Sequence, residues 1–186
     1  MNIFINAVSS QGKLIIFDDT RNIIGSQDIE IAGNESSRLS GMLDIFLQEH
    51  RVDYSDITNI VVVAGPGSFT GVRTICLMVN TIAFSVGCSI TPVSYFDLFS
   101  DPIVVKQSSK RDVFLYRSES GVSVLSNQEF LEYCDTNEIT QLAGEAASIS
   151  EKEIIENIDY YDIIRTIVLQ KETRIAPLYI KKPNIC

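Results

Sequence analysis

The residues best placed by type and spacing to do chemistry form a glycine-rich loop, Gly65-Pro66-Gly67-Ser68-Phe69-Thr70-Gly71-Val72-Arg73. Its glycines and proline permit backbone conformations and close approaches that side chains block. The loop follows the apolar run 60–64 and precedes a long apolar helix pattern. Its backbone amides therefore lie at a predicted helix start, where they favour an anion or a close protein contact.

The loop does not match the known glycine-rich motifs that bind nucleotides or carry a nucleophile. A Walker loop needs a lysine before its Ser/Thr, and a dinucleotide fingerprint needs its third glycine three residues after the second. Gly71 comes four residues after Gly67, and Ser68 lacks the flanking glycines of a nucleophile elbow. Both a structural or contact-making turn and a phosphate site remain open. We expect Gly67 and Gly71 to serve backbone geometry rather than ligand contact.

No other residues form a catalytic constellation. The single histidine, His50, lies on the apolar stripe of a predicted helix, where packing or capping is its expected role. Cys76, Cys88, Cys134 and Cys186 lack metal-ligand spacing and are expected to be reduced thiols. The acidic-aromatic run 159–162 is expected to be surface. The sequence thus predicts no catalytic residue, no cofactor and no metal site.

The composition of the chain argues against direct nucleic-acid binding and against a membrane protein. The chain has 186 residues, a formal net charge of −9 and a pI near 4.6. A chain this acidic is not expected to bind nucleic acid through its own field. No signal peptide is recognisable, and no apolar run approaches the roughly 20 residues of a membrane span. We therefore expect a cytosolic protein with no membrane partner.

The elements that must position the loop follow an alternating order. Strand patterns at 1–8, 14–17 and 22–31 predict an antiparallel meander. A helix at 35–51, a strand at 59–64, a helix at 70–86 and a strand at 89–93 follow it. This order is that of half an actin-like or ribonuclease-H-like fold, a mixed sheet flanked by helices.

The second half repeats the pattern weakly. Strand patterns at 102–106, 112–117 and 122–125 precede a short helix at 127–134 and a strand at 139–143. Helical patterns follow at 150–158, where Glu151, Glu153 and Glu156 suit a first turn, and at 162–172. We expect an N-terminal lobe, 1–99, and a C-terminal lobe, 100–186, whose final helix could pack on the first lobe.

The helix at 70–86 lacks the charged outer face that an exposed helix normally carries. Its outward positions include Leu77, Met78 and Phe84, with the single charge of Arg73. A helix that is apolar or neutral nearly all round is buried on two sides. Met42 and Ile45 lie off the apolar stripe of the preceding helix, and the two helices together predict a partner interface.

The run from Val63 to Arg73 resembles the signature of the TsaB (YeaZ) family, the partner subunit in bacterial tRNA threonylcarbamoyladenosine synthesis. Weaker matches occur in the right order along most of the chain. They are Ser36-Ser37-Arg38-Leu39, Pro92-Val93-Ser94, Arg111-Asp112-Val113-Phe114 and Ala176-Pro177-Leu178-Tyr179-Ile180-Lys181.

The resemblance implies an actin-like (ASKHA) fold of two lobes and a non-catalytic scaffold in the cytoplasm. The implied partner is TsaD, the catalytic paralogue, with the ATPase TsaE in a larger complex and a homodimer as a further form. The TsaD complex transfers a threonylcarbamoyl group to an adenosine beside the tRNA anticodon, so tRNA is met only through the complex. The first-lobe helices make the contact in that family.

Departures from the family's catalytic relatives agree with such a role. Asn6 stands where many relatives have the metal-holding Asp, and Glu35 stands where a histidine is often found. The metal-binding histidine pair of the catalytic paralogue is absent, and the second lobe is reduced. The alternative function is a small ASKHA-type ATPase or phosphotransferase that uses the glycine loop. The lack of a triad and of metal ligands argues against a third alternative, an independent protease.

Overall fold

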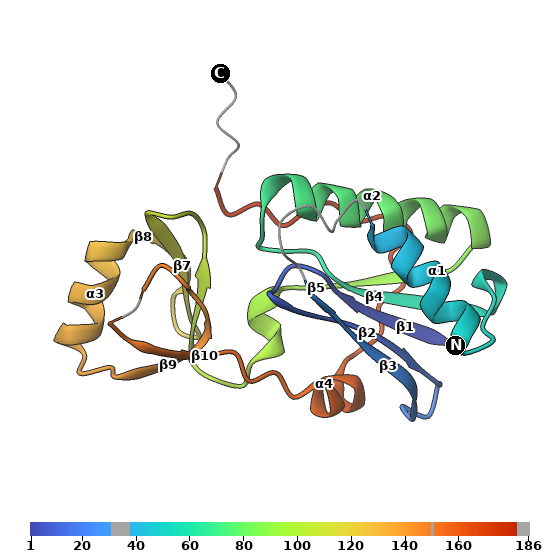
Figure 1. Cartoon of the computed structure of the whole chain (residues 1–186), viewed down its shortest axis with the longest axis horizontal. Helices are drawn as coiled ribbons and strands as arrows, with labels where there is room; N and C mark the ends of the chain where they lie inside the picture. The colour runs from blue at the N-terminus through green and yellow to red at the C-terminus, as the bar shows by residue number, and fades with distance from the viewer. Residues whose placement is uncertain (31–37, 150, 182–186) are drawn as a thin grey trace, which may run out of the picture. The chain divides into compact units, whose positions relative to one another are not determined.

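The computed structural model of the chain describes residues 1–30, 38–149 and 151–181 (Figure 1). The chain divides into two compact units. The first comprises Met1–Tyr95 and Tyr160–Leu178, and the second comprises Phe96–Asp159 and the chain from Tyr179 onward. The helix start predicted at Glu35, its Ser36-Ser37 signal and Cys186 lie outside the described residues.

The first unit is built on a five-stranded mixed sheet in the order β3-β2-β1-β4-β5. The meander pairs antiparallel, whereas β1, β4 and β5 are parallel neighbours. The elements are β1 (Asn2–Asn6), β2 (Gln11–Phe17), β3 (Ile23–Glu30), α1 (Leu39–Glu49), the 3-10 turn η2 (Tyr54–Asp56), β4 (Asn59–Val63), α2 (Phe69–Val86) and β5 (Ser89–Val93). This confirms the predicted fold class and element order.

The core of the first unit lies between the sheet and helices α1 and α2. Alternation along β1 sends Ile3 and Ile5 toward these helices, where Phe46 of α1 and Val79 of α2 meet them in one buried cluster. Phe4 points to the other face, where its ring meets the edge of Tyr160 of α4 (Tyr160–Thr166). The central strands are therefore buried on both faces, which explains why both faces of β1 and β4 carry apolar side chains.

The second unit repeats the topology of the first. Its sheet has the order β10-β9-β6-β7-β8, with β6, β9 and β10 parallel and the β6-β7-β8 meander antiparallel. Between β9 and β10 the described residues form no helix, so this lobe is reduced relative to the first. Its elements are the 3-10 turn η3 (Tyr95–Leu98) leading in, β6 (Ile103–Gln107), β7 (Asp112–Arg117), β8 (Gly121–Ser126), α3 (Asn127–Thr136), β9 (Gln141–Glu145) and β10 (Glu153–Ile155).

Two helix predictions after residue 149 are wrong. In the predicted helix 150–158 the chain forms β10, because Ile154 packs on the core cluster of the second unit while Glu153 and Ile155 face solvent. That alternation has the period of a strand, and the acidic residues do not mark a helix start. The predicted helix 162–172 ends at Thr166, since the chain beyond it is extended and Glu172 pairs with Ile90 of β5.

Candidate functional site

The glycine loop connects β4 to α2 and is held by backbone hydrogen bonds on both sides. The amide of Ala64 donates to Val93 O at 2.9 Å, and the amide of Tyr95 donates to Gly65 O at 2.7 Å. The amide of Leu178 donates to Ala64 O at 2.8 Å. The loop is therefore fixed by β5 and by the last residues of the first unit.

The glycine that needs its conformational freedom is Gly65, with φ +125°, where a Cβ would lie 2.9 Å from the carbonyl oxygen of Leu178. Pro66 follows it through a cis peptide bond. Gly67 has no positive φ, but a Cβ there would lie 3.0 Å from Cγ2 of Val72. The role expected of Gly67 was backbone geometry; the structure gives it a packing role against Val72, and Gly65 takes the conformational role.

Ser68 caps the start of α2. Its Oγ accepts a hydrogen bond from the amide of Gly71 at 3.2 Å, and a Cβ on Gly71 would lie 2.6 Å from that oxygen. Gly71 therefore keeps room for the cap, which explains a glycine in the first turn of a helix. Arg73 stacks over the ring of Phe69 at 5.2 Å, and both side chains are exposed. Thr70, Phe69 and Arg73 are therefore exposed to solvent at the start of α2.

Asn6 is the last residue of β1. It is fully buried, and its Nδ2 donates to Ser9 Oγ at 3.0 Å and to the hydroxyl of Tyr160 at 2.9 Å. Its Oδ1 accepts from the amide of Val8 at 3.3 Å. The Tyr160 hydroxyl donates in turn to Gln11 O at 3.2 Å. Asn6 lies opposite Lys13 of β2, which forms an ion pair with Asp28 and lies over the Tyr160 ring. Asn6 makes its hydrogen bonds within the first unit.

The remaining chemical candidates have structural roles. No group of three or more His, Cys, Asp or Glu side chains that could hold a metal occurs among the described residues. Nδ1 of His50 lies 2.8 Å from Phe46 O, and its ring covers Gly25, where a Cβ would lie 2.1 Å from Nε2. This confirms the expected packing role. Burial raises the pKa of the Cys76 thiol to about 11, so the thiol is protonated at neutral pH.

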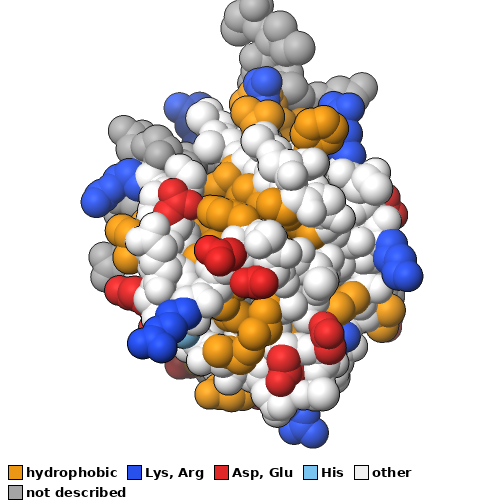
Figure 2. Space-filling model, turned by 90° about the vertical axis from the view of Figure 1, so that its right-hand side faces the viewer, with side chains coloured by type: hydrophobic (Ala, Val, Ile, Leu, Met, Phe, Trp, Pro, Cys, Tyr) orange, Lys and Arg blue, Asp and Glu red, His pale blue; other side chains and the backbone are white. Residues whose placement is uncertain are grey.

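The predicted partner residues divide into two groups. Ile45, Leu77 and Phe84 are exposed, with relative accessibilities of 57%, 69% and 90%. Met42 and Met78 are half-buried and pack against the core of the first unit, so their contribution to an outer surface is smaller. We call Ile45, Leu77 and Phe84 the outer helical face. Figure 2 shows hydrophobic side chains gathered beside acidic ones on the molecule's surface.

By length and composition alone, α2 is apolar enough to cross a membrane. Packing explains that composition, because Val72, Ile75, Cys76, Val79 and Ala83 are buried in the core of the first unit. The side-chain amide of Asn80 also makes two hydrogen bonds with the backbone of Ile175, one as donor and one as acceptor. A helix that packs on a sheet can be as long and apolar as a membrane-spanning helix, and α2 packs on the sheet of the first unit.

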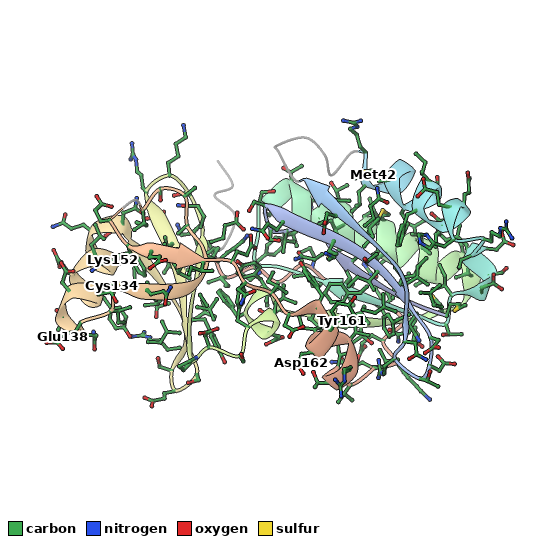
Figure 3. All side chains as sticks on the ribbon, turned by 60° about the horizontal axis from the view of Figure 1, so that its bottom comes forward. Met42, Cys134, Glu138, Lys152, Tyr161 and Asp162 are labelled. Atoms are coloured by element: carbon green, nitrogen blue, oxygen red, sulfur yellow. The ribbon has the colours of Figure 1, made fainter. Side chains whose placement is uncertain are left out.

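The run 159–162 is only partly the predicted surface patch. Tyr161 and Asp162 are exposed on α4 (Figure 3), whereas Tyr160 turns inward to Phe4 and Asn6. The spacing of Tyr160 and the fully buried Ile164 was the available signal, because residues i and i+4 share one face of a helix.

Part of the chain matches a known protein family, and its fold resembles two solved structures. The family model of TsaD, tRNA N6-adenosine threonylcarbamoyltransferase, matches residues 29–118, just under half of the chain. YeaZ from Pseudomonas aeruginosa is 18% identical over 67% of this chain and 63% of its own length, with a TM-score of 0.51. A second solved structure, an uncharacterized protein with similarity to peptidase YeaZ from Pseudomonas aeruginosa, is 15% identical with a TM-score of 0.68. The alignment covers 97% of this chain and 99% of that one.

The chain has the YeaZ fold. The resemblance to the TsaB (YeaZ) family is thereby confirmed at the level of the fold, which is what likenesses of 15–18% identity establish. The chain spans less than two thirds of the length of the Pseudomonas aeruginosa YeaZ structure. None of the curated proteins matches the sequence.

Proposed function

We propose that this chain is a non-catalytic subunit of the tRNA threonylcarbamoyladenosine system in the cytoplasm. In this role it binds a TsaD-type transferase, within a larger complex that includes a TsaE-type ATPase, and supports transfer of a threonylcarbamoyl group to an adenosine beside the tRNA anticodon. The YeaZ fold and the TsaD family match support a place in this system. The observation that carries the subunit role is the outer helical face on a unit in which Asn6 is buried and hydrogen-bonded to Ser9 and Tyr160.

The hairpin argues against chemistry of its own. Metal-bound phosphate needs carboxylate oxygens or water at the hairpin, because Mg²⁺ is held by hard oxygen ligands. Here Asn6 donates its amide to Ser9 and Tyr160, and the Tyr160 ring covers Phe4. The sequence also holds a single histidine, His50, which packs on Gly25. A TsaD-like histidine pair for metal therefore has no counterpart in this chain.

The outer helical face supports binding. Covering the exposed parts of Ile45, Leu77 and Phe84 would contribute about 3–6 kcal/mol, from roughly 1.5–3 kcal/mol for each fully buried side chain. Since α2 carries one charged residue, Arg73, a partner helix meets little desolvation cost along most of its length. The same face allows a homodimer when the partner is absent. With a net charge of −9, contact with tRNA is expected through the partner.

A small ASKHA-type ATPase is the second candidate, because the glycine loop opens directly into the start of α2. Its Ser68 hydroxyl, however, already caps the helix by accepting from Gly71. The two functions differ in a direct assay. The purified chain is expected to hydrolyse no ATP above a control preparation and to cleave no peptide. Turnover that Ser68→Ala abolishes would establish the enzymatic alternative instead.

The subunit role itself is tested by reconstitution. Modified adenosine is measured by mass spectrometry on tRNA incubated with a threonylcarbamoyl donor, ATP, and the TsaD and TsaE proteins of the same organism. We expect the modification to depend on adding this chain. Equal modification with and without the chain would refute the proposal.

A further inference from the structure

The segment Tyr160–Leu178, which we call the strap, belongs to the first unit although the chain on either side of it belongs to the second. It begins at α4 on the face of the sheet that carries Phe4 and runs past β5 to α2 on the opposite face (Figure 1). The strap therefore closes the β5 edge of the sheet. It is joined to the rest of its own unit by non-covalent contacts alone.

Many of these contacts are hydrogen bonds to the backbone of the strap, and Arg21 donates one of them to Ile167 O at 2.9 Å. At β5, Ile90 and Glu172 exchange amide-to-carbonyl bonds of 2.7 and 3.2 Å. Gln170 donates its amide to Thr91 Oγ1 at 2.8 Å and accepts from Asn59 Nδ2, also at 2.8 Å. These bonds fix the position of the strap through its backbone, so they do not depend on the identity of its side chains.

The C-terminal part of the strap is held to α2 and to the glycine loop. Asn80 of α2 donates Nδ2 to Ile175 O and accepts from the amide of Ile175, both at 2.9 Å. The amide of Leu178 donates to Ala64 O at 2.8 Å, beside Gly65. The strap thus bonds directly to α2, which carries Leu77 and Phe84 of the outer helical face.

Apolar burial along the strap is sparse. Ile164 and Ile175 are its buried hydrophobic residues, at 0% and 8% accessibility, whereas Val168 is 79% exposed. By contrast, every residue of β1 and β4 is buried. Segments with few buried apolar contacts and hydrogen bonds near solvent open at lower free energy than the core around them.

We propose that the strap is a releasable element, which detaches as one piece while the sheet, α1 and α2 stay folded. Release frees the Asn6 hairpin from Tyr160, the β5 edge from Glu172 and Asn80 from Ile175. It therefore sets how firmly the glycine loop and α2 are held. This device is independent of the proposed partner, because it concerns contacts within the first unit.

Native-state hydrogen exchange on the full chain, followed by NMR, tests the proposal. The reporters are the amides of Gln170, Glu172, Ile175 and Leu178, each bonded to another part of the first unit. We expect these four amides to exchange through one shared opening, at least about 100-fold faster than amides of β1 and β4. Exchange of all of them with the same opening free energy as β1 would overturn the proposal.

A matched pair of variants on α2 sharpens the test. Asn80→Ala removes both bonds to Ile175, and should speed exchange of the four reporter amides about 10-fold or more without changing β1 amides. Thr81→Ala, which removes a bond only to Leu77 O of its own helix, should leave them unchanged. Equal rates in Asn80→Ala and parent, or an equal change at β1, would also overturn the proposal.

Limited trypsin digestion gives a second readout of the same opening. Lys171 and Arg174 are exposed residues of the strap, where cleavage requires local release of the chain. We expect first cuts there, faster in Asn80→Ala than in Thr81→Ala. First cuts at Lys13 or Arg73, within the sheet and α2, would show that the strap is no weaker than the core.

Discussion

Replacement of Gly65 by alanine tests the geometry of the glycine loop most sharply. At φ +125° an L-residue is strained by about 1–3 kcal/mol. The new Cβ would also lie 2.9 Å from Leu178 O, a shorter distance than Cβ atoms in proteins keep from other atoms. Moving Leu178 away weakens its hydrogen bond to Ala64, which is worth about 1 kcal/mol. Together these effects lower the free energy of unfolding by about 2–4 kcal/mol.

Urea unfolding followed by far-UV circular dichroism measures this loss, with Gly41→Ala as the matched control. Gly41 lies in α1 with open space around its Cα and no positive φ, so alanine there should stabilise by about 0.5–1 kcal/mol. The two substitutions add the same methyl group and should shift the midpoint in opposite directions. A Gly65→Ala protein as stable as its parent would refute the assigned role of Gly65.

Two further predictions concern single side chains. Tyr160→Phe removes the hydroxyl that bonds Asn6 and Gln11 and should lower the free energy of unfolding by about 1–2 kcal/mol in urea; an unchanged midpoint would mean that these bonds contribute nothing. Hydrogen bonds from Thr20 and Asn22 lower the pKa of Asp18 from 3.8 to about 2. Its stabilising contribution is therefore present above about pH 4 and lost as pH falls toward 2, and an NMR titration of Thr20→Ala should show the Asp18 pKa closer to 3.8.

Most of the fold could be predicted because each half follows a strand or helix period. The apolar run of β4 and the apolar stripe of α2 were visible in the sequence. β10 was not, because three residues with one inward side chain, Ile154, carry too little pattern to outweigh the acidic residues around them. Beyond Thr166 the strap leaves the helix, because Glu172 pairs with Ile90, a contact between distant residues that local sequence does not encode.

The candidate site was predicted less completely than the fold. The glycine loop was identified, but the glycine under conformational demand is Gly65, and this depends on the path of Leu178 more than a hundred residues later. The inward turn of Tyr160 depends likewise on Asn6, at the other end of the chain. Leu77 and Phe84 are exposed, as their place opposite the apolar stripe of α2 indicated.

Binding to a TsaD-type protein through the outer helical face is the most direct test of the proposed role. Sedimentation velocity on mixtures of this chain with the TsaD protein of the same organism measures it. The parent and Glu132→Lys, a charge change on exposed α3, should form the complex. Leu77→Glu buries an unpaired charge and should weaken binding by at least about 100-fold, with unchanged circular dichroism and no self-association. No complex with the parent chain, or equal binding by Leu77→Glu, would contradict the account.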